Sequence, residues 1–207
     1  LAVCNEAPTP AVNFTGGVAG TTFNWENNNT TIGLSSSGTG NISSFTALNA
    51  GVLPAVANIR VTPTANSCKG AVSAFNITVN PTPKLTSGLT IASVCTGTPV
   101  SYTPTSGTPG TAFSWVRDQV AGISNPAASG TGSINETLNN TTTGPITVTY
   151  KYTLAANGCT SAQVYEVKVV VNPAPQLSST LTPDPLCSGT EFSYSPTSST
   201  PGASFSW

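Results

Sequence analysis

The residues of this chain that are most able to form covalent bonds are its five cysteines, Cys4, Cys68, Cys95, Cys159 and Cys187. The first, third and fifth follow one another at intervals of 91 and 92 residues, and the second and fourth are also 91 residues apart. A cysteine pair that recurs in a chain with few charges is typical of disulfide-bonded extracellular proteins. We therefore expect disulfides and an extracellular or cell-surface location.

No other combination of residues predicts chemistry. The chain has no histidine, so the usual general-base and acyl-transfer arrangements are absent, and it has no Cys-x-x-Cys spacing for a metal. The carboxylates are scattered singly along the sequence, as Glu6, Glu26, Asp118, Glu136, Glu166, Asp184 and Glu191. We expect no enzyme, no metal and no cofactor.

The low charge and the lack of long apolar runs exclude two further classes of partner. Only 13 of the 207 residues are charged and the net charge is −1, with no basic run, so we expect no binding to nucleic acid. No apolar run approaches the roughly 20 residues that span a bilayer, so we expect no membrane insertion. Thr, Ser, Asn, Gly and Pro dominate instead, and these residues favour strands and turns.

The sequence repeats itself. Trp25, Trp115 and Trp207 are spaced by 90 and 92 residues, in step with the cysteines. Residues 95–115 read CTGTPVSYTPTSGTPGTAFSW and residues 187–207 read CSGTEFSYSPTSSTPGASFSW, with 14 of 21 positions identical. The repeats therefore span residues 1–83, 84–175 and 176–207. Both ends of the chain fall within a motif, so we expect a longer parent protein.

Each repeat is expected to be a β-sandwich. Ile146 to Leu154 alternate apolar and polar residues, Asn157-Gly158 is a strong hairpin signal, and residues 165–171 alternate again. About seven such short strands in about 91 residues, with no helical periodicity, predict an all-β immunoglobulin-like fold. The expected core residues are aromatic: Trp25, Trp115, Trp207, Phe113, Tyr150 and Tyr152.

The first repeat is expected to be the less stable one. It has Ala57, Ile59 and Val61 where the second repeat has Val148, Tyr150 and Tyr152. Smaller side chains bury less apolar surface and therefore stabilise the sandwich less.

Two disulfide patterns remain open. In one, the cysteines pair within repeats, as Cys4–Cys68 and Cys95–Cys159. In the other, Cys4 pairs with Cys159 and links two repeats. The second pattern is favoured by geometry, because the two cysteines of one immunoglobulin-like sandwich lie at opposite ends, roughly 25–30 Å apart, and a disulfide needs Cα atoms within about 7 Å. The first is favoured by its simplicity.

Four motifs carry a resemblance to a known family. They are Cys-x-Gly-Thr-x-x-Ser-Tyr, Pro-Gly-x-x-Phe-Ser-Trp, Asn-Gly-Cys, and Val-Asn-Pro-x-Pro at the joints. Together they resemble the PKD-like tandem repeats of giant type IX-secreted surface adhesins of the Bacteroidota, some of which are linked to gliding motility. In the first repeat, Asn5-Glu6-Ala7 departs from the pattern. The resemblance implies an extracellular adhesin or stalk.

The expected function is structural. Short Pro-x-Pro joints stiffen the connections, and each sandwich should add roughly 35–45 Å of length. The repeats would then form a stalk that extends and displays a distal binding region, with neighbouring repeats as their partners. The alternatives are a module that binds surface polysaccharide or protein, and self-association through edge strands into an extracellular filament.

Overall fold

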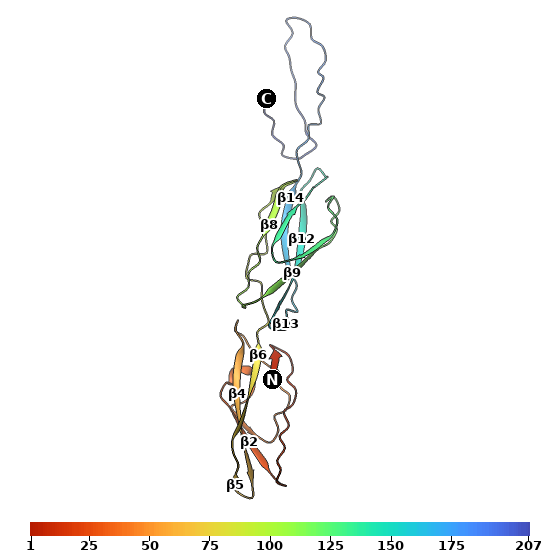
Figure 1. The fold of residues 1–207 in the computed structure, drawn as a ribbon. Helices are drawn as coiled ribbons and strands as arrows, with labels where there is room; N and C mark the ends of the chain where they lie inside the picture. Colours follow the sequence, from red (N-terminus) through yellow and green to blue (C-terminus); the bar gives the residue numbers. More distant parts are fainter. The chain divides into compact units, whose positions relative to one another are not determined.

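The computed structural model describes residues 1–207 and is built of β-strands, with one short 3-10 helix, η1 (Thr30–Ile32) (Figure 1). No helix in it is long and apolar enough to cross a bilayer. The chain divides into two compact units. The first comprises residues 1–86, 105–113 and 153–163, and the second comprises residues 87–104, 114–152 and 164–207.

The strands up to residue 80 form one six-stranded sheet, in the order β1-β6-β4-β2-β3 with β5 also paired to β4. Only β1 and β6 run parallel. Two isolated bridges, Pro8↔Thr46 and Val12↔Ile42, link the segments that precede and follow β2 and β3. The strands are β1 (Ala2–Cys4), β2 (Thr22–Asn27), β3 (Ser37–Thr39), β4 (Ala55–Ala65), β5 (Cys68–Lys69) and β6 (Ser73–Asn80).

The strands from residue 94 to residue 172 repeat this arrangement. A six-stranded sheet has the order β10-β9-β12-β14-β7, with β13 paired to β12, and β8 and β11 form a separate two-stranded sheet. The strands are β7 (Val94–Cys95), β8 (Pro99–Tyr102), β9 (Ala112–Arg117), β10 (Ala128–Thr131), β11 (Ile134–Thr137), β12 (Ile146–Ala156), β13 (Cys159–Thr160) and β14 (Tyr165–Asn172). The predicted all-β, immunoglobulin-like sandwich fold is confirmed.

The alternation in the sequence explains the long hairpin of the second sheet. In β12, the side chains of Val148, Tyr150, Tyr152 and Leu154 are all fully buried, while the three residues between them are less buried. The strand then reverses at the Asn157-Gly158 turn, where both residues have positive φ, 52° and 77°. Asparagine and glycine adopt this backbone conformation at little cost, so the dipeptide fixes the register of the hairpin.

The core of the first sheet is built from smaller residues. Ala57, Ile59 and Val61 on β4 pack with Ile77 and Val79 on β6. The equivalent positions of β12 carry Val148, Tyr150 and Tyr152, and the Trp115 and Tyr150 rings meet edge to face at 5.5 Å between centroids. The lower stability of the first repeat stays a prediction.

Trp25 and Trp115 are each buried opposite a glycine of the neighbouring strand. The register pairs Trp25 with Gly38 and Trp115 with Gly130. A Cβ atom at Gly130 would lie 2.6 Å from Cζ2 of Trp115, and one at Gly38 would clash with the Trp25 ring. Each of these glycines begins a Gly-Thr-Gly segment, residues 38–40 and 130–132. The segments therefore do more than turn the chain, because their first glycine makes room for the indole.

We predict that Gly130→Ala lowers the free energy of unfolding by about 1–3 kcal/mol, because the new methyl group must displace the Trp115 ring. Urea denaturation followed by tryptophan fluorescence measures the effect. Gly144→Ala is the matched control, since a Cβ atom there meets no atom within 4 Å. Equal stability of the two variants would contradict this account of the tryptophan.

The third tryptophan corrects one sequence expectation. Trp207 was expected in a core, but its side chain is fully exposed. Residues 176–207 contain no named strand. Phe113 is only partly buried, whereas Tyr150 and Tyr152 lie fully in the core.

The third segment still forms local contacts found at the start of the second repeat. The Ser179 hydroxyl lies 2.8 Å from the Tyr194 hydroxyl, as the Ser87 hydroxyl lies 2.7 Å from the Tyr102 hydroxyl. The bridge Leu177↔Ser198 likewise matches Leu85↔Ser106. These contacts are local in sequence and need no strand from the rest of a sandwich.

Candidate functional site

The one covalent cross-link in the chain joins Cys4 to Cys159. Their Cα atoms are 5.6 Å apart, and the bond spans a sequence separation of 155 residues. Cys68, Cys95 and Cys187 are exposed free thiols. Of the two patterns that the sequence left open, the structure therefore contains the link between repeats and not the pairing within repeats.

The end of the first strand positions Cys4. It pairs with Asn80 at the end of β6, and the Asn5 amide donates a hydrogen bond of 2.8 Å to the Asn80 carbonyl. A four-residue turn follows, closed by the Ala7 amide and the Cys4 carbonyl at 3.1 Å. The third residue of this turn, Glu6, has a positive φ of 66°, a conformation usually given to glycine.

The tip of the long hairpin positions Cys159. It faces Ala156 across the Asn157-Gly158 turn, and only 1% of its surface is exposed. The Asn157 carbonyl accepts a hydrogen bond of 2.9 Å from the Asn80 side-chain amide. A disulfide and a side-chain hydrogen bond thus hold the same two backbone segments together.

The turn around Cys4 recurs at the other two cysteines of its series. Cys95 pairs with Asn172 as Cys4 pairs with Asn80. The Thr98 amide donates to the Cys95 carbonyl at 3.1 Å, and the Thr190 amide donates to the Cys187 carbonyl at 3.2 Å. Gly97 and Gly189 have the positive φ that Glu6 has in the first repeat. The departure of Asn5-Glu6-Ala7 from the family pattern therefore leaves the backbone turn intact.

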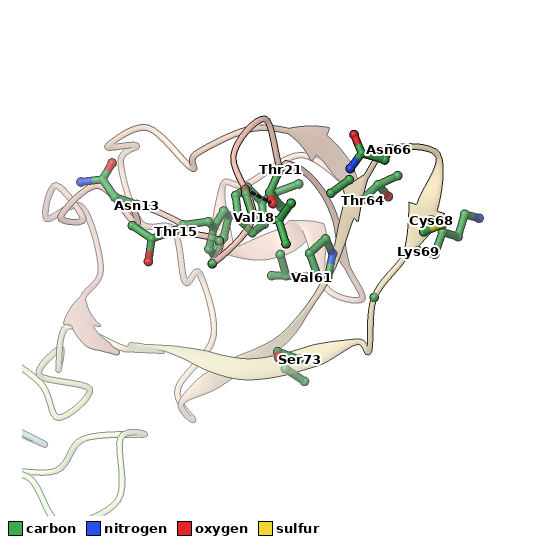
Figure 2. Close-up of a pocket in the computed structure, with 18 of the residues that line it drawn as sticks. Asn13, Thr15, Val18, Thr21, Val61, Thr64, Asn66, Cys68, Lys69 and Ser73 are labelled. Atoms are coloured by element: carbon green, nitrogen blue, oxygen red, sulfur yellow. Dashed lines mark hydrogen bonds between the residues drawn. The ribbon is translucent and has the colours of Figure 1, made fainter.

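A groove of about 720 Å³ opens at the β4–β5 hairpin of the first unit (Figure 2). Its lining includes the rings of Phe14, Phe23 and Phe75. The centroid of the Phe14 ring lies 5.5 Å from that of Phe23 and 6.4 Å from that of Phe75. Val18 also lines it and is 54% exposed. Cys68 and Lys69 lie on β5 at its edge, as Figure 2 shows. The groove thus offers apolar surface beside a free thiol.

A buried ion pair lies beside the core of the second sheet. The Arg117 side chain is almost completely buried, and its Nε donates to Glu136 Oε2 at 3.0 Å. The Tyr150 hydroxyl donates to the same oxygen at 2.7 Å, and Arg117 Nη2 donates to the Pro126 carbonyl at 2.7 Å. Burial, followed by the hydrogen bond to Glu136, raises the pKa of Tyr150 well above its usual value.

This ion pair is a structural feature that sequence reasoning missed. Glu136 stood among the scattered carboxylates, and nothing in the sequence paired it with Arg117, 19 residues away. The strand register is the missing signal, because β9 and β11 must be aligned before the two side chains can be placed together. No group of three or more His, Cys, Asp or Glu residues in the structure could hold a metal ion.

Sequence and structure comparisons place the chain at a distance from the proteins that they find. No curated protein is significantly similar to the chain in sequence. Among solved structures, the chain is similar to the IG1+IG2 fragment of DIP-gamma, with 11% identity, 83% of this chain and 92% of that chain covered, and a TM-score of 0.40. It is similar to the EC1-4 fragment of Drosophila N-cadherin with 13% identity, 86% and 50% covered, and a TM-score of 0.38. These values are too low to carry an argument about fold or function.

The family comparison is more specific. Residues 92–175 match the family model of the PKD-like domain. The matched segment contains every strand from β7 to β14, including the Cys95 turn and the Asn157-Gly158 hairpin. The second repeat is therefore similar to the PKD-like domain, and the chain is an all-β protein of the immunoglobulin-like sandwich class.

Proposed function

We propose that this chain is part of the stalk of a large secreted cell-surface adhesin, in which disulfide-linked repeats extend and display a distal binding region. The observation that carries the proposal is the Cys4–Cys159 bond, because it joins a cysteine of the first repeat to a cysteine of the second. A stalk must transmit tension from one repeat to the next, and a covalent link does this without relying on surface contacts.

The position of this bond suits a load-bearing role. Tension applied at the two ends of the chain enters at Cys4, crosses the disulfide and continues from Cys159. The backbone between these residues closes a loop that lies outside this covalent path. Most strands of both sheets are in that loop, so tension cannot extend them even if their packing fails, whereas β14 lies outside the loop.

The proposed location is the cell surface. A disulfide that forms between repeats persists in an oxidising compartment, outside the cytosol. The match to the PKD-like domain supports the resemblance to repeats of giant adhesins exported by the type IX secretion system. Export by that route, and a role in adhesion or gliding, belong to this proposal.

Small-angle X-ray scattering tests the stalk. The oxidised C68S/C95S/C187S variant keeps the Cys4–Cys159 bond and has no free thiol that would link copies. We expect an extended particle with a maximum dimension of at least roughly 70–90 Å for two sandwiches in line. A compact particle, or a broad distribution of shapes, would contradict the stalk and favour a binding module.

A further inference from the structure

Another cavity, of about 690 Å³, lies in the first compact unit, where the first repeat meets the start of the second. Its lining comes from residues 5–6, 48–52, 82–86 and 107–108, together with Thr31. These are the turn after Cys4, a loop of the first repeat, the joint, and a turn of the second repeat. Segments of both repeats thus form its walls. We call it the joint cavity.

The joint cavity contains two opposite charges. The carboxylate of Glu6 and the ammonium of Lys84 both line it, and both side chains are exposed. The three ion pairs of the chain all lie in the second repeat, so neither of these two groups is paired. Only 13 of the 207 residues are charged. Two unpaired opposite charges in one cavity therefore distinguish it from the rest of this largely neutral surface.

Glu6 lies at a backbone position that favours glycine. Its φ is 66°, and the corresponding residues of the other repeats are Gly97 and Gly189. The hydrogen bonds correspond as well, since the Glu6 amide donates to the Ala47 carbonyl at 2.7 Å and the Gly97 amide donates to the Leu138 carbonyl at 2.9 Å. A residue with a side chain adopts this left-handed conformation at a cost that glycine avoids. The first repeat therefore carries its carboxylate at the expense of its own turn.

Three more lining positions carry apolar or charged residues where the second repeat and its joint carry neutral polar ones. They are Leu48, Val52 and Lys84, which correspond to Asn139, Thr143 and Gln176. Leu48 and Val52 are 46% and 51% exposed, so they present an aliphatic wall to the solvent. The first joint thus combines charge with apolar surface, and the second joint has neither at these positions.

Polar groups without a partner also line the joint cavity. Thr108 is 4% exposed, and its hydroxyl forms no hydrogen bond, whereas the hydroxyl of the corresponding Thr200 donates to the Ala174 carbonyl at 3.4 Å. The Asn5 side chain accepts from the Asn49 amide at 2.7 Å, but its NH2 group has no acceptor. A buried hydroxyl without a partner costs free energy, which a ligand that bonds to it would recover.

We propose that the joint cavity binds a short apolar peptide with free ends, whose ammonium group meets Glu6 and whose carboxylate meets Lys84. A round cavity of this volume is about 11 Å across, and three extended residues span about 10–11 Å, so a tripeptide fits. The inference goes beyond the stalk and does not depend on it.

The remaining walls suit the same ligand. The aliphatic side chains of Leu48 and Val52 would pack against apolar side chains of the peptide. The Thr108 hydroxyl and the Asn5 NH2 group would bond to its backbone carbonyls. No aromatic residue lines the cavity, so there is no ring on which a sugar could stack. The lining therefore favours a peptide over a saccharide.

Trileucine, a zwitterion at neutral pH, is the probe for this site. It is titrated into the full ¹⁵N-labelled chain, in the oxidised C68S/C95S/C187S form used for scattering, and amide shifts are followed by NMR. We expect saturable shifts at the residues that line the joint cavity. Acetylation of the amino end, or amidation of the carboxyl end, should weaken binding by about tenfold each, because each removes a charge-assisted hydrogen bond.

Glu6→Gly/Lys84→Gln in the same chain gives the first joint the residues of the second. The fold already accommodates these residues at the second joint, so the variant should fold and lose saturable binding of trileucine. Glu26→Gln/Lys69→Gln is the matched control, because it removes one charge of each sign outside the joint cavity and should bind as before.

Three results would overturn the inference. The first is the absence of saturable shifts up to the solubility limit of trileucine. The second is equal binding of trileucine with free and with blocked ends, or equal binding by the Glu6→Gly/Lys84→Gln variant. The third is tighter binding of glucosamine or glucuronic acid than of trileucine, which would assign the cavity to saccharides. None of them affects the stalk proposal, which the scattering experiment tests separately.

Discussion

Replacing Glu136 by alanine should lower the free energy of unfolding of the second repeat by about 3–5 kcal/mol. The substitution leaves the guanidinium of Arg117 buried with only the Pro126 carbonyl as a partner, and it removes the acceptor of the Tyr150 hydroxyl. The cost arises because the desolvation free energy of the buried charge is no longer offset by the attraction of a counter-ion. Hydrogen exchange read by mass spectrometry should show faster exchange throughout β12 and β14, with β4 and β6 unchanged.

Asp118→Asn is the matched control for this prediction. Asp118 forms an ion pair of 2.6 Å with Lys151, but both side chains are well exposed. Water screens such a pair, so its loss should leave stability unchanged within error. If Glu136→Ala were as mild as Asp118→Asn, the Arg117–Glu136 pair would not be a major stabilising contact between β9 and β11.

Breaking the disulfide should change how far the chain extends under force. In the oxidised chain, residues between Cys4 and Cys159 cannot be pulled out, because the disulfide closes that loop. Cys159→Ser opens the loop, which should add roughly 510–560 Å to the fully extended length, at about 3.3–3.6 Å for each of the 155 residues. Single-molecule pulling from the two ends of the chain measures this length directly.

Cys68→Ser is the matched control for this second prediction. Cys68 holds the hairpin position in the first repeat that Cys159 holds in the second, but its thiol is free. The substitution should therefore leave the extended length equal to that of the oxidised, unmodified chain. Reduction of the unmodified chain should reproduce Cys159→Ser. Equal extended lengths for the oxidised chain and Cys159→Ser would show that the disulfide does not shield the loop.

Much of the fold was predictable because the signals are local. The alternation in β12 and the Asn157-Gly158 turn fix a strand and its reversal within a few residues. The repeated spacing of Cys and Trp then predicts the same strands in the other repeats. The same reasoning expected Trp207 in a core, whereas its side chain is fully exposed, because burial depends on contacts with other strands and a local motif does not specify them.

The candidate site was less predictable because it depends on pairing between distant segments. The sequence narrowed the disulfide to two patterns, but the choice requires knowing that Cys4 and Cys159 come within bonding distance. The Arg117–Glu136–Tyr150 cluster needs the alignment of β9, β11 and β12. In each case, the deciding fact is a tertiary contact rather than a residue type.

Disulfide mapping tests the central claim most directly. Proteolysis of the oxidised chain under non-reducing conditions, followed by mass spectrometry, should yield a peptide pair that contains Cys4 and Cys159. It should also yield free Cys68 when thiols are blocked before oxidation between copies can occur. Recovery of a Cys4–Cys68 peptide pair in its place would mean that each repeat closes on itself, and the covalent link between repeats would be lost.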